Sequence, residues 1–197
     1  MKAKNLWMIV LGAAVLSTAA CTVTGPRTVS TTGVNIMVDY RQFDSIEQLA
    51  DSADLVVWGT ITGSRVQQID DAIQPTTDDP TLNPGGDVTS SSMTVYTVYT
   101  LAVDNCYKGC GGVGDSIEFR QIGGLFDGVQ YTASPRADVQ LDHKYVLFLS
   151  TYPDTIAGLL NPPQSVYIGD DGPTNGQSLD PQNPWTASPD DLVRLFR

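Results

Sequence analysis

The sequence predicts a mostly β domain with minor α content: one short helix near the start of the domain and one at its end. Three observations lead to this prediction. Several runs of β-branched and aromatic residues have the composition and partial alternation of strands. Stretches rich in Gly, Pro, Asp and Asn separate these runs. Two short segments instead carry apolar residues at helical spacing, each with a capping residue before it.

The first element of the chain has the layout of a secretory signal peptide. Lys2 and Lys4 form a basic start, an apolar run covers 6–16, and small residues lead up to Cys21. This run is shorter than the about 20 apolar residues that a membrane-spanning helix needs. We therefore expect a signal peptide over 1–20.

A tether and a helix are expected next. Residues 21–43 begin with the cysteine and are rich in Thr, Val and Gly, which suits a tether, and their last part alternates enough to form a strand. The domain is then expected to cover 44–197. Asp44 is the predicted N-cap of its first helix, with Glu47 as the reciprocal capping partner. The apolar face of this helix consists of Ile46, Leu49, Ala50 and Ala53.

Four strong strand candidates follow. The first contains Gly59 and Gly63, which predict bulges or a sharp coil. The second also requires a bulge, because its apolar residues cannot share one face at period two. The third is expected to end at Gly123 and Gly124, and the fourth is apolar enough to be buried on both faces. In order, these strands cover 55–69, 93–105, 116–122 and 144–150.

Weaker strands and long loops complete the domain. The weaker strands are expected at 129–131, 156–160 and 165–168. The two longest loops, at 70–92 and 169–185, are acidic and rich in Pro and Gly, which is typical of insertions or binding loops. The C-terminal helix is expected to begin after Ser188 as N-cap, with Pro189 in its first turn.

Charge limits the partners of this domain. The 197-residue chain has 11 basic and 22 acidic residues, and removal of Lys2 and Lys4 with the signal peptide changes the net charge from −11 to −13. So acidic a surface repels phosphate backbones and anionic lipid head groups. We therefore expect no nucleic-acid partner and no electrostatic binding to membranes.

Apart from Cys21, the chain has two cysteines, Cys106 and Cys110. Outside the cytoplasm such a neighbouring pair is expected to be oxidised, and the glycines around it allow the turn that brings the sulfur atoms together. The pair would then hold a hairpin tip. A redox pair and a metal site are the alternatives, although the spacing is CxxxC and few further zinc ligands are present.

The residues LSTAAC that end at Cys21 resemble the lipobox of bacterial lipoproteins. This resemblance implies that Cys21 receives a diacylglycerol and that the preceding peptide is removed. Thr18 stands where the family usually has Leu. The alternative is an ordinary signal peptide cut after Ala20, which leaves a free Cys21 thiol.

Four further pieces resemble the netrin-like and metalloproteinase-inhibitor class of OB-fold barrels. They are ADLVVWGTI at 53–61, YTLAVDNCYKG at 99–109, GDSIEFR at 114–120 and LDHKYVLFL at 141–149. The resemblance implies a small OB-like barrel, closed or partly closed. Inhibitors of this class reach the protease zinc with an N-terminal cysteine, whereas Cys21 lies far before the barrel and lacks a matching disulfide framework.

Two motifs could carry chemistry. His143, the single histidine, would need an activated serine beside it for Ser-His-Asp catalysis, and the sequence has no GxSxG elbow. Residues 109–114 match GxGxxG, but a strand rather than a phosphate-binding helix is expected after them. We therefore interpret His143 as a surface turn residue and the glycine motif as a chance match.

The acidic loops and exposed aromatics are further candidates. Six aspartates could supply oxygen ligands to calcium, or solvated charge alone: Asp70, Asp71, Asp78, Asp79, Asp170 and Asp171. Three aromatics, Tyr152, Tyr167 and Trp185, are expected to be exposed and could line a groove, or pack against the core.

These observations favour a noncatalytic binding or interaction domain in the cell envelope, held on a membrane by the lipid on Cys21, with no cofactor and no metal. Its ligand or envelope protein partner is not specified by the sequence. The alternatives are an inhibitor or regulator of an envelope protease and a hydrolase that uses clustered carboxylates.

Overall fold

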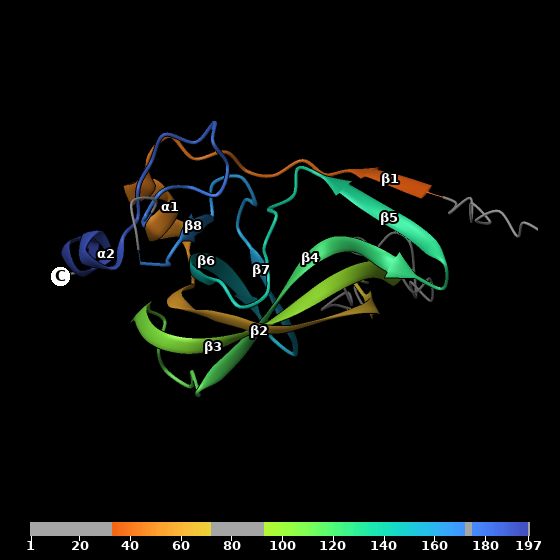
Figure 1. Ribbon diagram of the computed structural model, residues 1–197, viewed down its shortest axis with the longest axis horizontal. Helices are drawn as coiled ribbons and strands as arrows, with labels where there is room; N and C mark the ends of the chain where they lie inside the picture. Colours follow the sequence, from red (N-terminus) through yellow and green to blue (C-terminus); the bar gives the residue numbers. More distant parts are fainter. Residues whose placement is uncertain (1–32, 72–92, 172–174, 197) are drawn as a thin grey trace, which may run out of the picture. The chain divides into compact units, whose positions relative to one another are not determined.

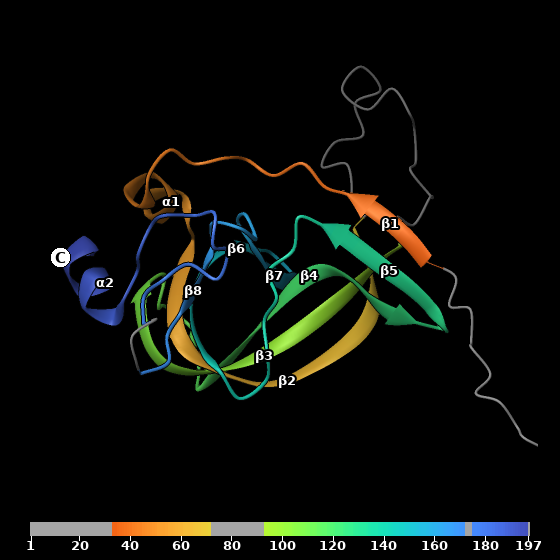
Figure 2. The ribbon, with the colours of Figure 1, turned by 45° about the horizontal axis from the view of Figure 1, so that its top comes forward.

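The computed structural model describes residues 33–71, 93–171 and 175–196 (Figures 1 and 2). They belong to a compact unit that begins at Thr31. The predicted mostly β architecture is confirmed, with two short helices. The elements are β1 (Gly33–Met37), α1 (Ile46–Ser52), β2 (Leu55–Asp70), β3 (Met93–Lys108), β4 (Ser116–Phe126), β5 (Val129–Ser134), β6 (Lys144–Tyr152), β7 (Thr155–Leu159), β8 (Val166–Ile168) and α2 (Pro189–Leu195).

All eight strands belong to one sheet. Seven are ordered β1-β5-β4-β3-β2-β6-β7, and β8 pairs with β6. In addition, β4 pairs in parallel with β7, where Phe119 lies opposite Ala157 and Arg120 opposite Gly158. The pairings therefore run in a ring through β2, β3, β4, β7 and β6, which makes the sheet partly ring-like.

The long strands β2 and β3 form an antiparallel pair whose register shifts between Trp58 and Gly59 and again between Ile61 and Gly63. Both predicted glycine bulges are thus confirmed. The shift at Gly59 also places the β3 backbone close to its Cα: an added Cβ would lie 2.0 Å from the carbonyl oxygen of Ala102. Glycine is required here for close approach of two strands.

The expectation that Gly123 and Gly124 end their strand is wrong. Both have positive φ, 105° and 139°, and the strand continues to Phe126. The β4–β3 pairing stops at Ile122, and from Gly123 onward β4 pairs with β5 instead. Only glycine adopts this backbone without strain, so the two residues bend β4 from one partner to another.

The strand β5 is longer than expected because it has partners on both sides, β4 and the parallel strand β1 (Figure 2). Residues 33–43 lie with the folded unit, and β1 falls near the end of the predicted tether, where the sequence suggested a strand. Phe43 is buried, and its backbone N–H and carbonyl both bond to the Gln164 amide at 3.0 Å.

The core has two parts, one on each side of β2 and β6. Val57, Leu147 and Leu149 face the interior of the ring together with Phe119. Val56 and other neighbours face the opposite side, where α1 and α2 cover them. Alternation along each strand explains the division, and two covered faces explain why β6 is apolar throughout, as predicted.

Both helices have the expected apolar faces, but the N-cap of α1 is Ser45 and not Asp44. The Ser45 hydroxyl accepts from the Gln48 N–H at 3.3 Å, while the backbone N–H of Asp44 donates to the Gln48 side chain at 2.7 Å. Glutamine at the third helical position thus supports the turn, and the helix begins one residue later than expected.

The predicted Ser188 cap of α2 is confirmed, and Asp191 completes a capping box with it. In the described ranges, no helix has the length and apolar composition needed to cross a membrane.

Lys108, at the end of β3, caps the C-terminus of α1 from a distance in sequence. Its Nζ donates to the carbonyl oxygens of Ala50 and Asp51, both at 2.9 Å, and α1 has no basic residue of its own in its last turn. We expect Lys108→Met to lower the free energy of unfolding by about 1 kcal/mol, because the last carbonyls lose a cation. Urea unfolding measures this, and Lys108→Arg should recover part of the loss. An unchanged urea midpoint in Lys108→Met would contradict the capping role.

Candidate functional site

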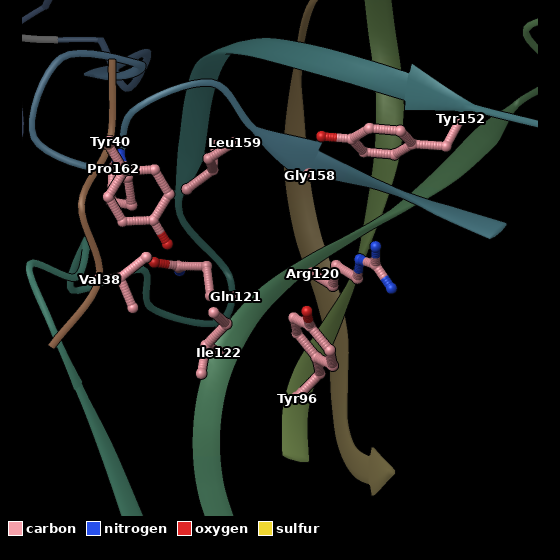
Figure 3. Close-up of a pocket in the computed structure, with 10 residues that line it drawn as sticks. All are labelled: Val38, Tyr40, Tyr96, Arg120, Gln121, Ile122, Tyr152, Gly158, Leu159 and Pro162. Carbon is pink, nitrogen blue, oxygen red and sulfur yellow. The ribbon is translucent and has the colours of Figure 1, made fainter. Parts of the chain in front are cut away.

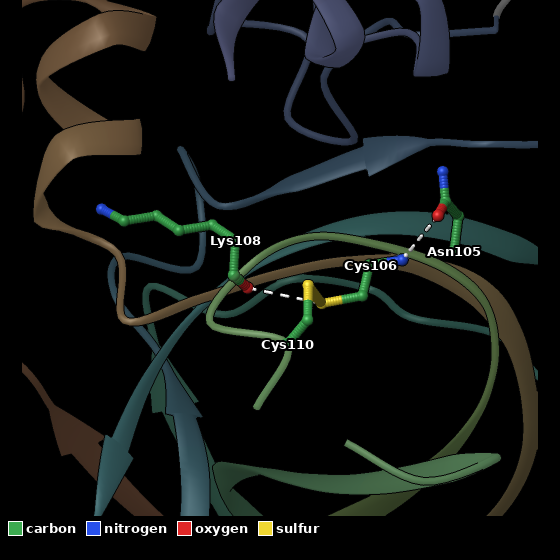
Figure 4. The surroundings of a disulfide bond; sticks show 4 residues. All are labelled: Asn105, Cys106, Lys108 and Cys110. Carbon is green, nitrogen blue, oxygen red and sulfur yellow. Dashed lines mark hydrogen bonds between the residues drawn. A yellow bond between two sulfur atoms is a disulfide. The ribbon is translucent and has the colours of Figure 1, made fainter. Parts of the chain in front are cut away.

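The cysteines lie in two different parts of the chain. Cys21 lies outside the described residues, so its lipidation stays a prediction. The sulfur atoms of Cys106 and Cys110 are 2.08 Å apart, at disulfide-bond distance, with the two Cα atoms 5.8 Å apart (Figure 4). The pair joins the end of β3 to the exposed turn that leads toward β4. The GxGxxG motif at 109–114 lies in this turn, and no helix begins there.

His143 is an exposed turn residue, as expected. Its Nδ1 lies 2.8 Å from a carboxylate oxygen of Asp170, whose other oxygen accepts from the Lys144 backbone N–H at 3.0 Å. Partial burial acts to raise the pKa of Asp170, but the Lys144 amide and His143 together hold this pKa below its usual value. In the described part of the chain no serine hydroxyl is hydrogen-bonded to His143, so no Ser-His-Asp triad occurs among these residues.

The acidic candidates are dispersed. Asp78 and Asp79 lie outside the described residues, and within those residues no cluster of three or more potential metal ligands occurs. Asp71 pairs with Arg120, and Asp170 with His143.

A hydrolase based on carboxylates would need an acid with a raised pKa. Within the described residues, every carboxyl group whose pKa departs from its usual value has a lowered pKa, because hydrogen bonds and cations favour the charged form. The groups with lowered pKa are Glu47, Glu118, Asp170 and Asp191.

Of the three aromatics expected to be exposed, only Tyr152 is. Tyr167 is fully buried, where its ring meets Phe148 edge-on, because β8 packs it beneath the helices. Trp185 is half-buried against the same part of the core. Tyr152, at the end of β6, lines a pocket.

This pocket brings a largely buried arginine together with three tyrosines, and we take it as the candidate site on that ground (Figure 3). It has a volume of about 120 Å³. The segment after β1, the strands β3, β4 and β7, the end of β6, and Pro162 form its walls. The lining residues are Val38, Tyr40, Tyr96, Arg120, Gln121, Ile122, Tyr152, Gly158, Leu159 and Pro162.

Strand register brings the polar residues of the pocket together. Phe119 faces the core, so Arg120 faces the opposite way. Tyr96 pairs with Ile122, which makes Tyr96 and Arg120 diagonal neighbours on one face. On the other side Arg120 lies opposite Gly158, and an added Cβ at Gly158 would be in ordinary contact with the Tyr152 ring, at 3.7 Å.

Several partners hold the Arg120 guanidinium in place. Nη1 donates to Asp71 at 3.0 Å, and Thr155 Oγ1 lies 3.4 Å away. Cζ lies 4.5 Å from the ring centre of Tyr96 and 5.8 Å from that of Tyr152, both within the range of a cation–π contact. Since the Tyr96 hydroxyl also donates to Asp71 at 2.7 Å, a single network fixes all these groups.

The tyrosine hydroxyls are further polar groups of the pocket, besides the Gln121 amide, which bonds to the Ala137 backbone. Figure 3 shows those of Tyr40 and Tyr152 pointing toward the same space. Burial raises the pKa of Tyr40, and the neighbouring Tyr152 adds to this; burial and the bond to Asp71 raise the pKa of Tyr96 strongly. The phenols of Tyr40 and Tyr96 therefore stay protonated at neutral pH, as hydrogen-bond donors and acceptors.

The sequence pointed to only one member of this site, Tyr152. Its other aromatic and charged members are separated by 24 to 56 residues in the chain, and neither spacing nor composition links them. A usable signal existed in the third strand candidate, where alternation puts Arg120 on the face opposite Phe119.

Comparison with protein-family models and with curated proteins found no match.

Proposed function

We propose that this chain is an exported lipoprotein, anchored through Cys21, whose folded unit is a noncatalytic binding module. The ligand binds in the pocket around Arg120 and the three tyrosines. One observation carries the binding proposal: a cation and exposed aromatic surface are held ready, in an open pocket, by contacts within the protein. Concave sites with polar groups held in fixed positions are typical of ligand binding.

The order of the strands supports an OB-like interpretation of the fold. In chain order the ring strands are β2, β3, β4, β6 and β7, and the ring closes through the parallel β4–β7 pair. OB-folds bind ligands on the face of their second and third strands and beside the loops that flank it. The corresponding elements here are β3, β4 and the β6–β7 turn, which contribute Tyr96, Arg120 and Tyr152.

The anchoring part of the proposal rests on the sequence before Cys21. We expect the full chain to incorporate radiolabelled palmitate in cells and to fractionate with membranes. Cys21→Ser should lose both the label and the membrane association, because stable anchoring needs acyl chains. The double variant Cys106→Ser/Cys110→Ser is the matched control and should keep both. Wild-type protein that incorporates no palmitate would contradict the lipoprotein assignment.

The binding part is tested with Arg120→Met. Detergent-solubilised full chain is immobilised and exposed to a digest of the bacterial cell envelope, and retained compounds are identified by mass spectrometry. We expect wild type to retain a ligand with unchanged mass and Arg120→Met to lose it. Arg65→Met is the matched control, because Arg65 also pairs with a carboxylate, that of Glu118, at 2.9 Å but lies outside the pocket. Equal retention by all three chains would refute the site, and chemically altered products would refute the noncatalytic role.

A further inference from the structure

The charge of the pocket is balanced. Among the described residues that line it, Arg120 is the one cation, and Asp71 pairs with it at 3.0 Å. A bound anion would be repelled by Asp71 and by the rest of the chain, whose net charge is −11. A bound cation would be repelled by the Arg120 guanidinium, which already lies between the rings of Tyr96 and Tyr152. A ligand without net charge meets neither penalty.

The lining is also divided by polarity. Val38, Ile122 and Leu159 supply apolar surface, whereas phenol hydroxyls and the guanidinium supply hydrogen-bonding groups. The matching ligand therefore has an apolar face and a polar edge. A pyranose ring has this form, since its C–H groups gather on its faces and its hydroxyl groups radiate from its rim.

The size of the pocket sets the length of the occupant. Its volume of about 120 Å³ is well below the roughly 300 Å³ at which pockets for whole drug-sized ligands begin. The pocket therefore takes one edge of a ring, and the rest of the ligand lies against Tyr152, which is 49% exposed at the open rim. The occupant is thus one unit of a longer molecule.

The Arg120 network lowers the entropic cost of such binding. The guanidinium is fixed before the ligand arrives, by Asp71 and by the rings on either side of it. A planar group with several N–H donors in fixed directions suits paired hydroxyl groups on adjacent ring carbons.

Building on the proposed function, we infer that the pocket binds one uncharged sugar ring, a hexose or an N-acetylhexosamine, within an envelope oligosaccharide. The Tyr152 ring packs on the sugar face, and Arg120 and the phenols bond to its hydroxyl groups.

Titration calorimetry on the detergent-solubilised full chain tests the inference. The probes are a β-1,4-linked N-acetylglucosamine trimer, a glucose trimer, a galacturonic acid trimer and a proline-rich decapeptide. We expect at least one neutral trimer to bind and the anionic trimer to bind at least tenfold more weakly. Tyr152→Ala should weaken the neutral trimer at least tenfold, and Tyr152→Phe by less than threefold, because stacking remains. Arg65→Met should bind like wild type.

Other outcomes overturn the inference in distinguishable ways. Tighter binding of the acidic trimer would make the pocket an anion site, and preference for the decapeptide would make it a peptide site. If no trimer binds while the envelope digest is still retained in an Arg120-dependent manner, the sugar assignment is wrong and the binding module stands. If the digest is not retained either, both fail.

Discussion

Gly59→Ala is expected to lower the free energy of unfolding by roughly 3 kcal/mol or more. A methyl group at this position would lie 2.0 Å from the carbonyl oxygen of Ala102 and 3.1 Å from the Leu101 side chain. The carbonyl belongs to the backbone of the paired strand, so the clash is relieved only by moving β2 and β3 apart at the center of the sheet. Urea unfolding followed by circular dichroism measures the loss.

Gly63→Ala is the matched control in the same strand. Its added methyl would meet only the Thr100 hydroxyl oxygen, at an ordinary 3.9 Å, so we expect a change within about 0.5 kcal/mol. If Gly59→Ala and Gly63→Ala unfold at the same urea concentration, the close approach of β2 and β3 is wrong. If Gly59→Ala yields no folded protein while Gly63→Ala folds normally, the expected direction holds.

Phe119→Ala is expected to cost about 3–5 kcal/mol. Phe119 is fully buried, its ring stacks on Tyr99 at 5.2 Å between centers, and it lies opposite Ala157 where β4 meets β7. Its removal leaves a cavity inside the ring of strands that backbone relaxation fills only in part. Since a domain of this size has about 5–15 kcal/mol in total, this loss is a large fraction of its stability, and urea unfolding measures it.

Leu125→Ala provides the comparison, because Leu125 lies on the same strand but is 57% exposed. We expect its urea midpoint to change little. We expect Phe119→Ala to disturb the pocket as well, because Arg120 is the next residue of β4. A Phe119→Ala chain as stable as Leu125→Ala would contradict the described core.

The sequence was most informative where a physical rule acts over a short distance. Alternation and β-branching located the long strands, the two glycines of β2 marked its bulges, and Ser188 marked the start of α2. The rule that glycine usually ends a strand was misleading at Gly123 and Gly124. Here a second partner, β5, continues the ladder beyond the bend, and local chemistry carries no information about that partner.

The candidate site was much less predictable for the same reason. Tyr40, Tyr96, Arg120 and Tyr152 come from four separate segments, and no local pattern marks any one of them as part of a site. The register of β3 with β4 and the parallel closure of β4 with β7 bring them together. The sequence left Tyr167 open between exposure and core packing, and its burial depends on a layer of helices that no local pattern in β8 encodes.

The parallel pairing of β1 with β5 has a mechanical consequence. The chain runs from β1 directly into Val38 and Tyr40, and five paired positions plus the Val38 N–H to Ser134 carbonyl bond at 3.0 Å fasten this stretch to its neighbour. A pull on the polypeptide before residue 33 is therefore borne by this row of hydrogen bonds before it distorts the pocket wall. The β1–β5 pairing therefore protects the shape of the pocket when force acts on the domain from its N-terminal side.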